Sequence, residues 1–128
     1  MTRDFKLLYV EDDQFDAEML VRCFERYAKD KACSIEIAAT VADAISKIDQ
    51  TTYDAVLLDW NLTDGNGPDV ASHMRAANIL APIIFLSGAW VGSQLVEAER
   101  YATVGCLKKV YDKNQIEKIY NLVLNNAA

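Results

Sequence analysis

The chain has 128 residues, 52% of them hydrophobic, a length that suits one globular domain and excludes two well-formed cores. Its 13 Lys and Arg residues against 19 Asp and Glu residues give a formal net charge of −6, and the basic residues are scattered. Proteins that follow a phosphate backbone need a basic patch, so this distribution argues against direct nucleic-acid binding. We therefore expect a single domain over residues 1–128.

The N-terminal segment does not predict contact with a membrane. The segment 1–6 carries three charges and no long apolar run follows it, which argues against a signal peptide and a membrane span. The three cysteines, Cys23, Cys33 and Cys106, form no CxxC pair and are odd in number, a pattern typical of buried free thiols in a reducing compartment. These features predict a soluble, cytoplasmic protein.

Short apolar runs alternate with amphipathic stretches five times along the chain. The first run, 6–10, ends in three acids, and the last of these, Asp13, is a natural N-cap. Beyond it, apolar residues recur at three- and four-residue spacing, as on the buried side of a helix. A shorter strand is predicted over 34–38, and Thr40 with Asp43 marks the start of a second helix.

The second half of the chain repeats this alternation. The run 55–58 is apolar on both faces and ends at Asp59. A polar loop through Gly67 follows, and Pro68 suits the first turn of a third helix. The remaining predicted elements are a strand over 83–86, a helix near 93–101, a short strand over 105–107 and a last helix that contains 116–123.

Strands that are apolar on both faces and separated by helices indicate a parallel sheet covered on both sides. Right-handed crossovers then give a doubly wound α/β fold. We expect five parallel strands in the flavodoxin-like order 2-1-3-4-5, with helices on both faces. In such sheets, ligands bind at the carboxyl ends of the strands.

Under this arrangement the side chains that follow four of the strands become neighbours, namely Glu11, Asp12, Asp59, Ser87 and Lys109. Three carboxylates brought together repel one another unless their pKa values rise or a cation binds. Such oxygen ligands suit Mg²⁺, and a Lys with a hydroxyl supplies donors for a phosphoryl group. Each residue alone also has an explanation as a cap, a turn or a surface charge, so the prediction rests on their joint occurrence.

At this point the chain resembles a known family, the receiver domains of two-component response regulators, over essentially its whole length. The resemblance rests on four segments: LYVED at 8–12, LLDWNLTDGNG at 57–67, LSG at 86–88 and GCLKK at 105–109. It implies that Asp59 is the phosphoacceptor and that Asp12 is a direct ligand of Mg²⁺ or Mn²⁺. It also implies that Glu11 acts through a metal-bound water and that Asn61 offers its backbone carbonyl to the same ion.

The resemblance assigns the remaining site residues and the function. Ser87 stands where receivers contact the phosphoryl group through a Thr or Ser, and Lys109 stands where they have an ion-pairing Lys. The implied function is phosphorelay signal transduction, in which Asp59 is phosphorylated by a sensor histidine kinase or phosphotransfer protein. The chain would catalyse this step and a slow dephosphorylation, but it would not be a turnover enzyme. Its partners would be a downstream protein or output domain, or a second copy bound through the elements at 93–101, 105–107 and 116–123.

Four positions depart from the family pattern. Thr63 replaces a common Pro, Asn66 replaces a common acid, and Val110 replaces a Pro that typically follows the Lys in a cis bond. Because a non-proline cis bond costs about 2.5–4 kcal/mol, we expect a trans bond before Val110. Cys106 replaces the Tyr or Phe that changes rotamer on phosphorylation, so we expect coupling through the Ser87 hydroxyl and the loop 88–93, with Trp90 as a moving part.

Two other functions remain open from the sequence. A pseudo-receiver would use the same fold as a protein-interaction module without phosphorylation, which the substitutions at Cys106 and Val110 allow. A phosphatase with an Asp nucleophile would need a second acid two residues beyond Asp59, where this chain has Asn61. The phosphatase is therefore the weaker alternative.

Overall fold

The computed structural model describes residues 5–28 and 33–126, so the predictions that concern the first four residues lie outside the described part of the chain. Five parallel strands form one sheet in the order β2-β1-β3-β6-β7. These strands are β1 (Phe5–Val10), β2 (Cys33–Ala38), β3 (Ala55–Asp59), β6 (Ile83–Ser87) and β7 (Gly105–Lys108). Numbered among themselves they follow the order 2-1-3-4-5, so the predicted doubly wound α/β fold is confirmed.

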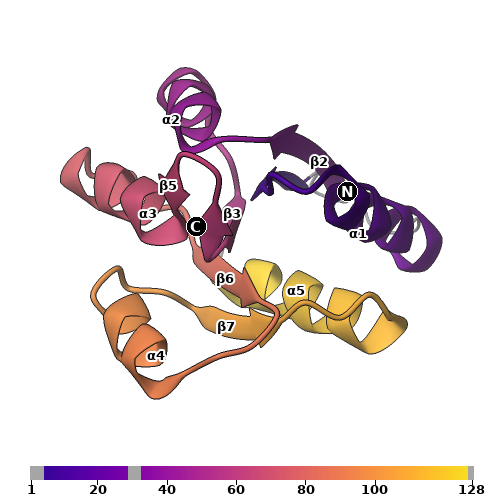
Figure 1. Cartoon of the computed structure of the whole chain (residues 1–128). Coiled ribbons are helices and arrows are strands. Elements are labelled where there is room, and N and C mark those ends of the chain that lie inside the picture. The colour runs from indigo at the N-terminus through magenta and orange to yellow at the C-terminus, as the bar shows by residue number, and fades with distance from the viewer. Residues whose placement is uncertain (1–4, 29–32, 127–128) are drawn as a thin grey trace.

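Helices cover both faces of the sheet (Figure 1). The helices are α1 (Gln14–Tyr27), α2 (Val41–Gln50), α3 (Gly67–Ala76), α4 (Gly92–Glu99) and α5 (Lys113–Asn126). One core lies between the sheet and α1 with α5, and the other lies between the sheet and α2, α3 and α4. Because side chains alternate along a strand, Leu57 enters the first core while its neighbours Val56 and Leu58 enter the second.

The helix starts follow the capping residues that the sequence indicates. The Asp13 carboxylate accepts the N–H of Asp16 at 2.9 Å, and the Thr40 hydroxyl oxygen accepts the N–H of Asp43 at 3.0 Å. Both side chains therefore satisfy backbone donors that a helix leaves unpaired in its first turn. These contacts fix the points at which the chain turns away from the carboxyl ends of β1 and β2.

The segment after β3 contains a small antiparallel hairpin, where the sequence had indicated only a polar loop. Its strands are β4 (Asn61–Leu62) and β5 (Gly65–Asn66). At the turn, the Asp64 carboxylate accepts the N–H groups of Val41 and Ala42 at 2.8 and 3.2 Å. Because these are the first residues of α2, Asp64 caps a helix that lies 22 residues or more before it in the chain.

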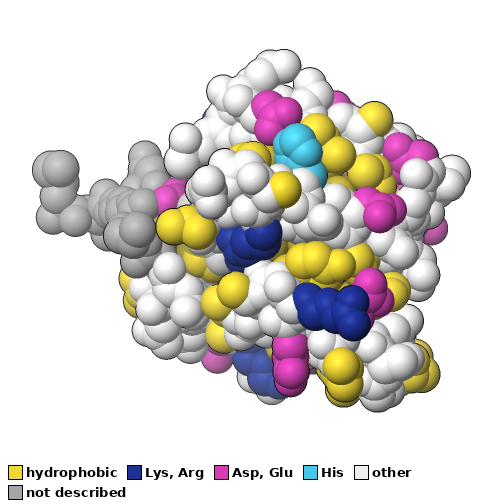
Figure 2. Space-filling model, turned by 90° about the vertical axis from the view of Figure 1, so that its left-hand side faces the viewer, with side chains coloured by type: hydrophobic (Ala, Val, Ile, Leu, Met, Phe, Trp, Pro, Cys, Tyr) yellow, Lys and Arg dark blue, Asp and Glu magenta, His cyan; other side chains and the backbone are white. Residues whose placement is uncertain are grey.

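Three further predictions can be compared with the structure. The described residues contain no cis peptide bond, so the bond before Val110 is trans, as predicted. All three cysteines are free, but only Cys23 is buried, whereas Cys33 and Cys106 are partly exposed, so the expectation of buried thiols is wrong for those two. No helix among the described residues has the length and apolar character needed to cross a bilayer. Figure 2 shows basic side chains separated by hydrophobic and acidic ones on the visible face.

Candidate functional site

The carboxyl ends of the central strands bring three acids together. Glu11 and Asp12 follow β1, and Asp59 is the last residue of β3. Val10 pairs with Leu58 in the parallel ladder, so Glu11 and Asp59 come next on neighbouring strands. One carboxylate oxygen from each acid lies within 4.8 Å of the others. The acids that the sequence predicts as neighbours therefore form one cluster.

Lys109 joins this cluster from the end of β7. Its ammonium Nζ lies 2.7 Å from Glu11 Oε1, 3.0 Å from Asp59 Oδ2 and 3.3 Å from Asp16 Oδ2. Burial alone would lower the pKa of Lys109, but the hydrogen bonds to Glu11 and Asp59 outweigh it and raise the pKa. The side chain is therefore a fixed positive charge in contact with Asp59. The contact with Asp16, an acid in the first turn of α1, was not predicted.

The surroundings of Glu11 raise its pKa. Glu11 is only 1% exposed, and burial together with its hydrogen bond to Asp59 raises its pKa to about 7, although Lys109 opposes the shift. Tyr9 donates its hydroxyl to Glu11 Oε1 at 2.9 Å, and the N–H of Asp13 approaches Oε2 at 3.3 Å. Burial and a neighbouring acid oppose the charged form of this carboxyl group, and a bound cation would favour that form.

Asp12 and Asn61 lie on the exposed side of the cluster. Asp12 Oδ2 accepts the Thr63 hydroxyl at 2.6 Å, a contact between residues that are 51 positions apart. Asn61 begins the β4–β5 hairpin, and its N–H lies 3.4 Å from Asp59 Oδ1. After the hairpin, the chain passes close to the backbone of Asp59 at Gly67. A Cβ atom on Gly67 would lie 2.5 Å from the Asp59 carbonyl oxygen. A residue with a side chain at Gly67 would therefore displace the end of β3.

Ser87 and Trp90 tie the loop after β6 to the sheet. Ser87 is buried beside the site, and its hydroxyl donates to the carbonyl of Ala89 at 2.8 Å and not to one of the acids. The Trp90 indole Nε1 donates to the carbonyl of Leu107 at 2.9 Å. Its ring stands edge-on to Trp60, the residue after Asp59, with 5.3 Å between the ring centroids. An aromatic contact therefore connects the residue that follows β3 to the loop that precedes α4.

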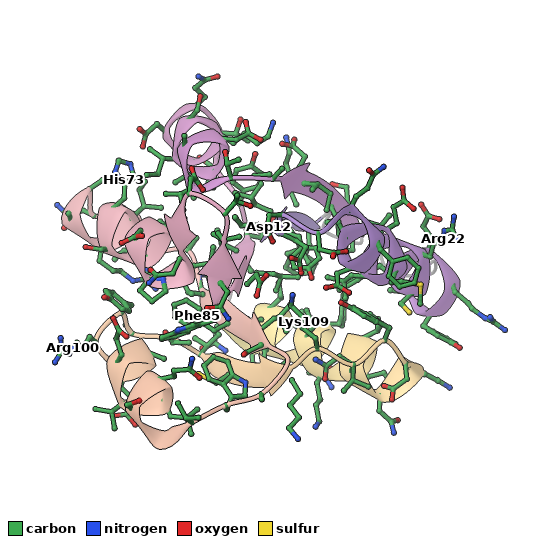
Figure 3. The ribbon with its side chains drawn as sticks, in the orientation of Figure 1. Asp12, Arg22, His73, Phe85, Arg100 and Lys109 are labelled. Carbon is green, nitrogen blue, oxygen red and sulfur yellow. The ribbon has the colours of Figure 1, made fainter. Side chains whose placement is uncertain are left out.

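Figure 3 shows the position of the site in the molecule. Asp12 and Lys109 lie near the middle of the view, with carboxylate oxygens gathered between them, whereas His73 and Arg100 lie at the periphery on α3 and just beyond α4. The arrangement offers hard oxygen ligands, one ammonium group and one nearby hydroxyl. These groups can hold a divalent cation and the oxygens of a phosphoryl group.

The comparisons with known proteins identify the family of the chain and agree with the fold. The family described as response regulator receiver domain matches residues 7–121, and the chain belongs to this family. Transcription factor SKN7 of Saccharomyces cerevisiae is 23% identical over 119 residues, which are 93% of this chain and 18% of the yeast protein. The transcriptional regulatory protein DltR of Streptococcus agalactiae is 35% identical over 82 residues, which are 64% of this chain and 35% of that protein.

A solved structure supports the same conclusion about the fold. The CheY-like receiver domain protein from Methanospirillum hungatei superposes with a TM-score of 0.85 at 20% identity, and the match covers 97% of each chain. By contrast, the chain matches only a minor part of the two curated relatives, 18% of SKN7 and 35% of DltR. Membership of the family places the chain in two-component signalling, which is based on phosphorylation.

Proposed function

We propose that this receiver domain is a phosphorylation switch with Asp59 as its phosphoacceptor. The observation that supports this most directly is the contact of one ammonium group, Lys109 Nζ, with both Asp59 and Glu11 inside a cluster of three acids. Asp59 is 4% exposed and ends a fully buried strand, so its carboxylate is held in one place. A positioned carboxylate beside a fixed positive charge suits attack on phosphorus.

A divalent cation, Mg²⁺ or Mn²⁺, fits the acids of this site. The ligands in this proposal are Asp12, Asp59 and the backbone carbonyl of Asn61, with Glu11 acting through a metal-bound water. Support comes from the donor set, because three carboxylates lie together and the pKa of Glu11 is raised to about 7 by burial and by Asp59. When bound, the cation would neutralise charge on the carboxylates and on the phosphoryl oxygens.

The proposed transfer uses groups that the chain already holds in position. A carboxylate oxygen of Asp59 forms a bond to phosphorus while the phosphorus–nitrogen bond of a partner's phosphohistidine breaks, and the imidazole nitrogen leaves with the electron pair. Lys109 balances the negative charge on the phosphoryl oxygens. Water later cleaves the acyl phosphate and returns the carboxylate and inorganic phosphate. The donor is a sensor histidine kinase or phosphotransfer protein, and the chain stores the group instead of turning over a substrate.

Phosphorylation would be read out on the face formed by α4, β7 and α5. The phosphoryl oxygens are acceptors for the Ser87 hydroxyl, which in the described state donates to Ala89. Apolar side chains stand exposed on or near this face, namely Val91, Leu95, Val96 and Val110. They suit an output domain, a downstream protein or a second copy of the chain. Phosphorylation would bias an equilibrium between two conformations of α4 and α5. Shifting the two conformations from a ratio of 1:99 to 99:1 takes about 5.5 kcal/mol of differential stabilisation.

Intact-mass spectrometry after incubation with acetyl phosphate tests the proposal. With Mg²⁺ present, the protein should gain one phosphoryl group, and it should gain none after chelation of the metal. Asp59→Asn should abolish the gain, whereas Asp49→Asn, at an exposed acid on α2, should not. A folded protein that gains no phosphate would instead be a pseudo-receiver. A gain in mass that persists in Asp59→Asn would show that another residue is the phosphoacceptor.

A further inference from the structure

The β4–β5 hairpin reaches the acid cluster through Thr63. The Thr63 hydroxyl donates to Asp12 Oδ2 at 2.6 Å, a short distance typical of a hydroxyl bonded to a charged carboxylate. Thr63 is exposed, and it lies at the turn of the hairpin, directly before Asp64. The contact therefore comes from a segment outside the five-stranded sheet that carries the other site residues.

The hairpin is itself fixed to the rest of the molecule. Asp64 accepts the first two N–H groups of α2, and Asn66 exchanges two hydrogen bonds with Asp69 at the start of α3. The N–H of Gly67 donates to the carbonyl of Trp60 at 2.9 Å. These attachments on both sides of the turn place the Thr63 hydroxyl over Asp12 without help from a ligand.

Asp12 needs such a partner more than the other acids do. Glu11 and Asp59 are buried and contact Lys109, whereas the Asp12 side chain is exposed. Within the described residues, Thr63 is the one side chain that donates a hydrogen bond to the Asp12 carboxylate. An exposed carboxylate that rotates freely must lose that freedom when it binds a metal, and a hydrogen bond that already orients it reduces this cost.

We propose that Thr63 is a positioning residue for metal binding, which it promotes by orienting the Asp12 carboxylate from the β4–β5 hairpin. The proposal rests on the metal site of the proposed function. It assigns a role to a position at which the chain departs from its family, since only a residue with a hydroxyl can make this contact. Removal of a group that orients a metal ligand typically weakens metal affinity by about 10–100-fold. Because the contact is exposed, we expect the lower end, about tenfold, for loss of the hydroxyl.

Titration with Mn²⁺, monitored by the electron paramagnetic resonance signal of the free ion, measures the affinity of the chain for Mn²⁺ directly. Competition with Mg²⁺ then gives the affinity for Mg²⁺. Thr63→Val, which keeps the shape and removes the hydroxyl, should bind Mn²⁺ about tenfold more weakly. Thr63→Ser should restore the affinity of the unaltered chain. Asp64→Ala, which releases the hairpin from α2 without touching Asp12, should weaken binding in the same direction. Thr52→Val, at an exposed threonine between α2 and β3, is the matched control and should bind normally.

The outcomes separate this inference from the proposed function. If the unaltered chain binds neither Mn²⁺ nor Mg²⁺, the proposed metal site fails and Thr63 has nothing to position. If the unaltered chain binds metal and Thr63→Val binds it equally well, the inference about Thr63 is overturned while the site stands. Equal weakening in Thr63→Ser and Thr63→Val would also overturn it, because the hydroxyl would not be the source. The unfolding temperature of metal-free Thr63→Val should match that of the unaltered chain, and a large fall would identify a structural role instead.

Discussion

Tyr9 supplies a polar contact inside a strand that otherwise contributes apolar side chains to the core. Its ring is fully buried, and its hydroxyl donates to Glu11 at 2.9 Å. Tyr9→Phe keeps the ring and removes one of the few donors to a buried carboxylate. We expect the free energy of unfolding, measured by urea denaturation at pH 8 without metal, to fall by about 1–3 kcal/mol.

Tyr53→Phe is the matched control for this prediction. Tyr53 is also buried, and its hydroxyl donates to the carboxylate of Glu36 at 2.7 Å. The Glu36 side chain is 40% exposed, so water can replace the lost donor and the change should cost less than Tyr9→Phe. Equal losses in the two variants would show that the burial of Glu11 does not strengthen its bond to Tyr9.

The raised pKa of Glu11 predicts a pH dependence of stability. The folded pKa is about 7 and the ordinary value is 4.5, so between these pH values the folded chain binds more protons than the unfolded chain. The contribution of Glu11 to stability therefore falls as the pH rises from about 4.5 to 7, by at most about 1.4 kcal/mol per pH unit for one proton. Unfolding free energies measured from pH 5 to 8 in the presence of a chelator should show this fall. Glu11→Gln should flatten it, and an unchanged profile would contradict the assignment to Glu11.

At the scale of elements, Arg75 connects α3 to the chain that leaves α4. Its guanidinium donates to the carbonyls of Tyr101 and Ile79 at 2.7 Å, and it approaches those of Ala81 and Ala102 at 3.2 and 3.5 Å. Arg75→Met keeps the aliphatic stem and removes the guanidinium donors from these carbonyls. We expect a loss of about 2–3 kcal/mol in the free energy of unfolding, measured by chemical denaturation.

Arg100→Met provides the comparison for Arg75. Arg100 is an exposed cation at the C-terminal end of α4, and Figure 3 shows its side chain at the periphery. Substitutions at such positions usually change stability by no more than about 0.5 kcal/mol. If Arg100→Met cost as much as Arg75→Met, general loss of positive charge would explain both results, and the contacts of Arg75 with the carbonyls would not.

The same elements show which features could be predicted from the sequence. The central strands could be predicted because buried parallel strands are apolar on both faces. The acid cluster followed because polar residues end or follow four of the five strands. The β4–β5 hairpin could not be predicted, since its contacts join residues that are 51 and 23 positions apart. The bond from Arg75 to the carbonyl of Tyr101 and the contact between Asp16 and Lys109 are likewise long-range pairings without a local pattern.

At the scale of the whole molecule, the proposed switch requires the site to communicate with the face formed by α4, β7 and α5 without the aromatic residue that Cys106 replaces. Trp90 is placed for this purpose, because its indole bonds to β7 and its ring contacts Trp60 beside Asp59. If phosphorylation draws the Ser87 hydroxyl away from Ala89, the loop that carries Trp90 loses one of the hydrogen bonds that hold it in place. The change at the site would then reach α4 through this loop.

Fluorescence can test this coupling because the chain has only two tryptophans. In Trp60→Phe, all tryptophan emission comes from Trp90, and phosphorylation should shift it to longer wavelength as water replaces the bond to Leu107. Adding Ser87→Ala should remove the shift while intact mass still shows the phosphoryl group on the chain. Emission that stays constant in a sample shown by mass to be phosphorylated would exclude Trp90 as the moving part. Any change on the exposed apolar face of α4 would then have to be transmitted from Asp59 through Lys109 and the segment that joins β7 to α5.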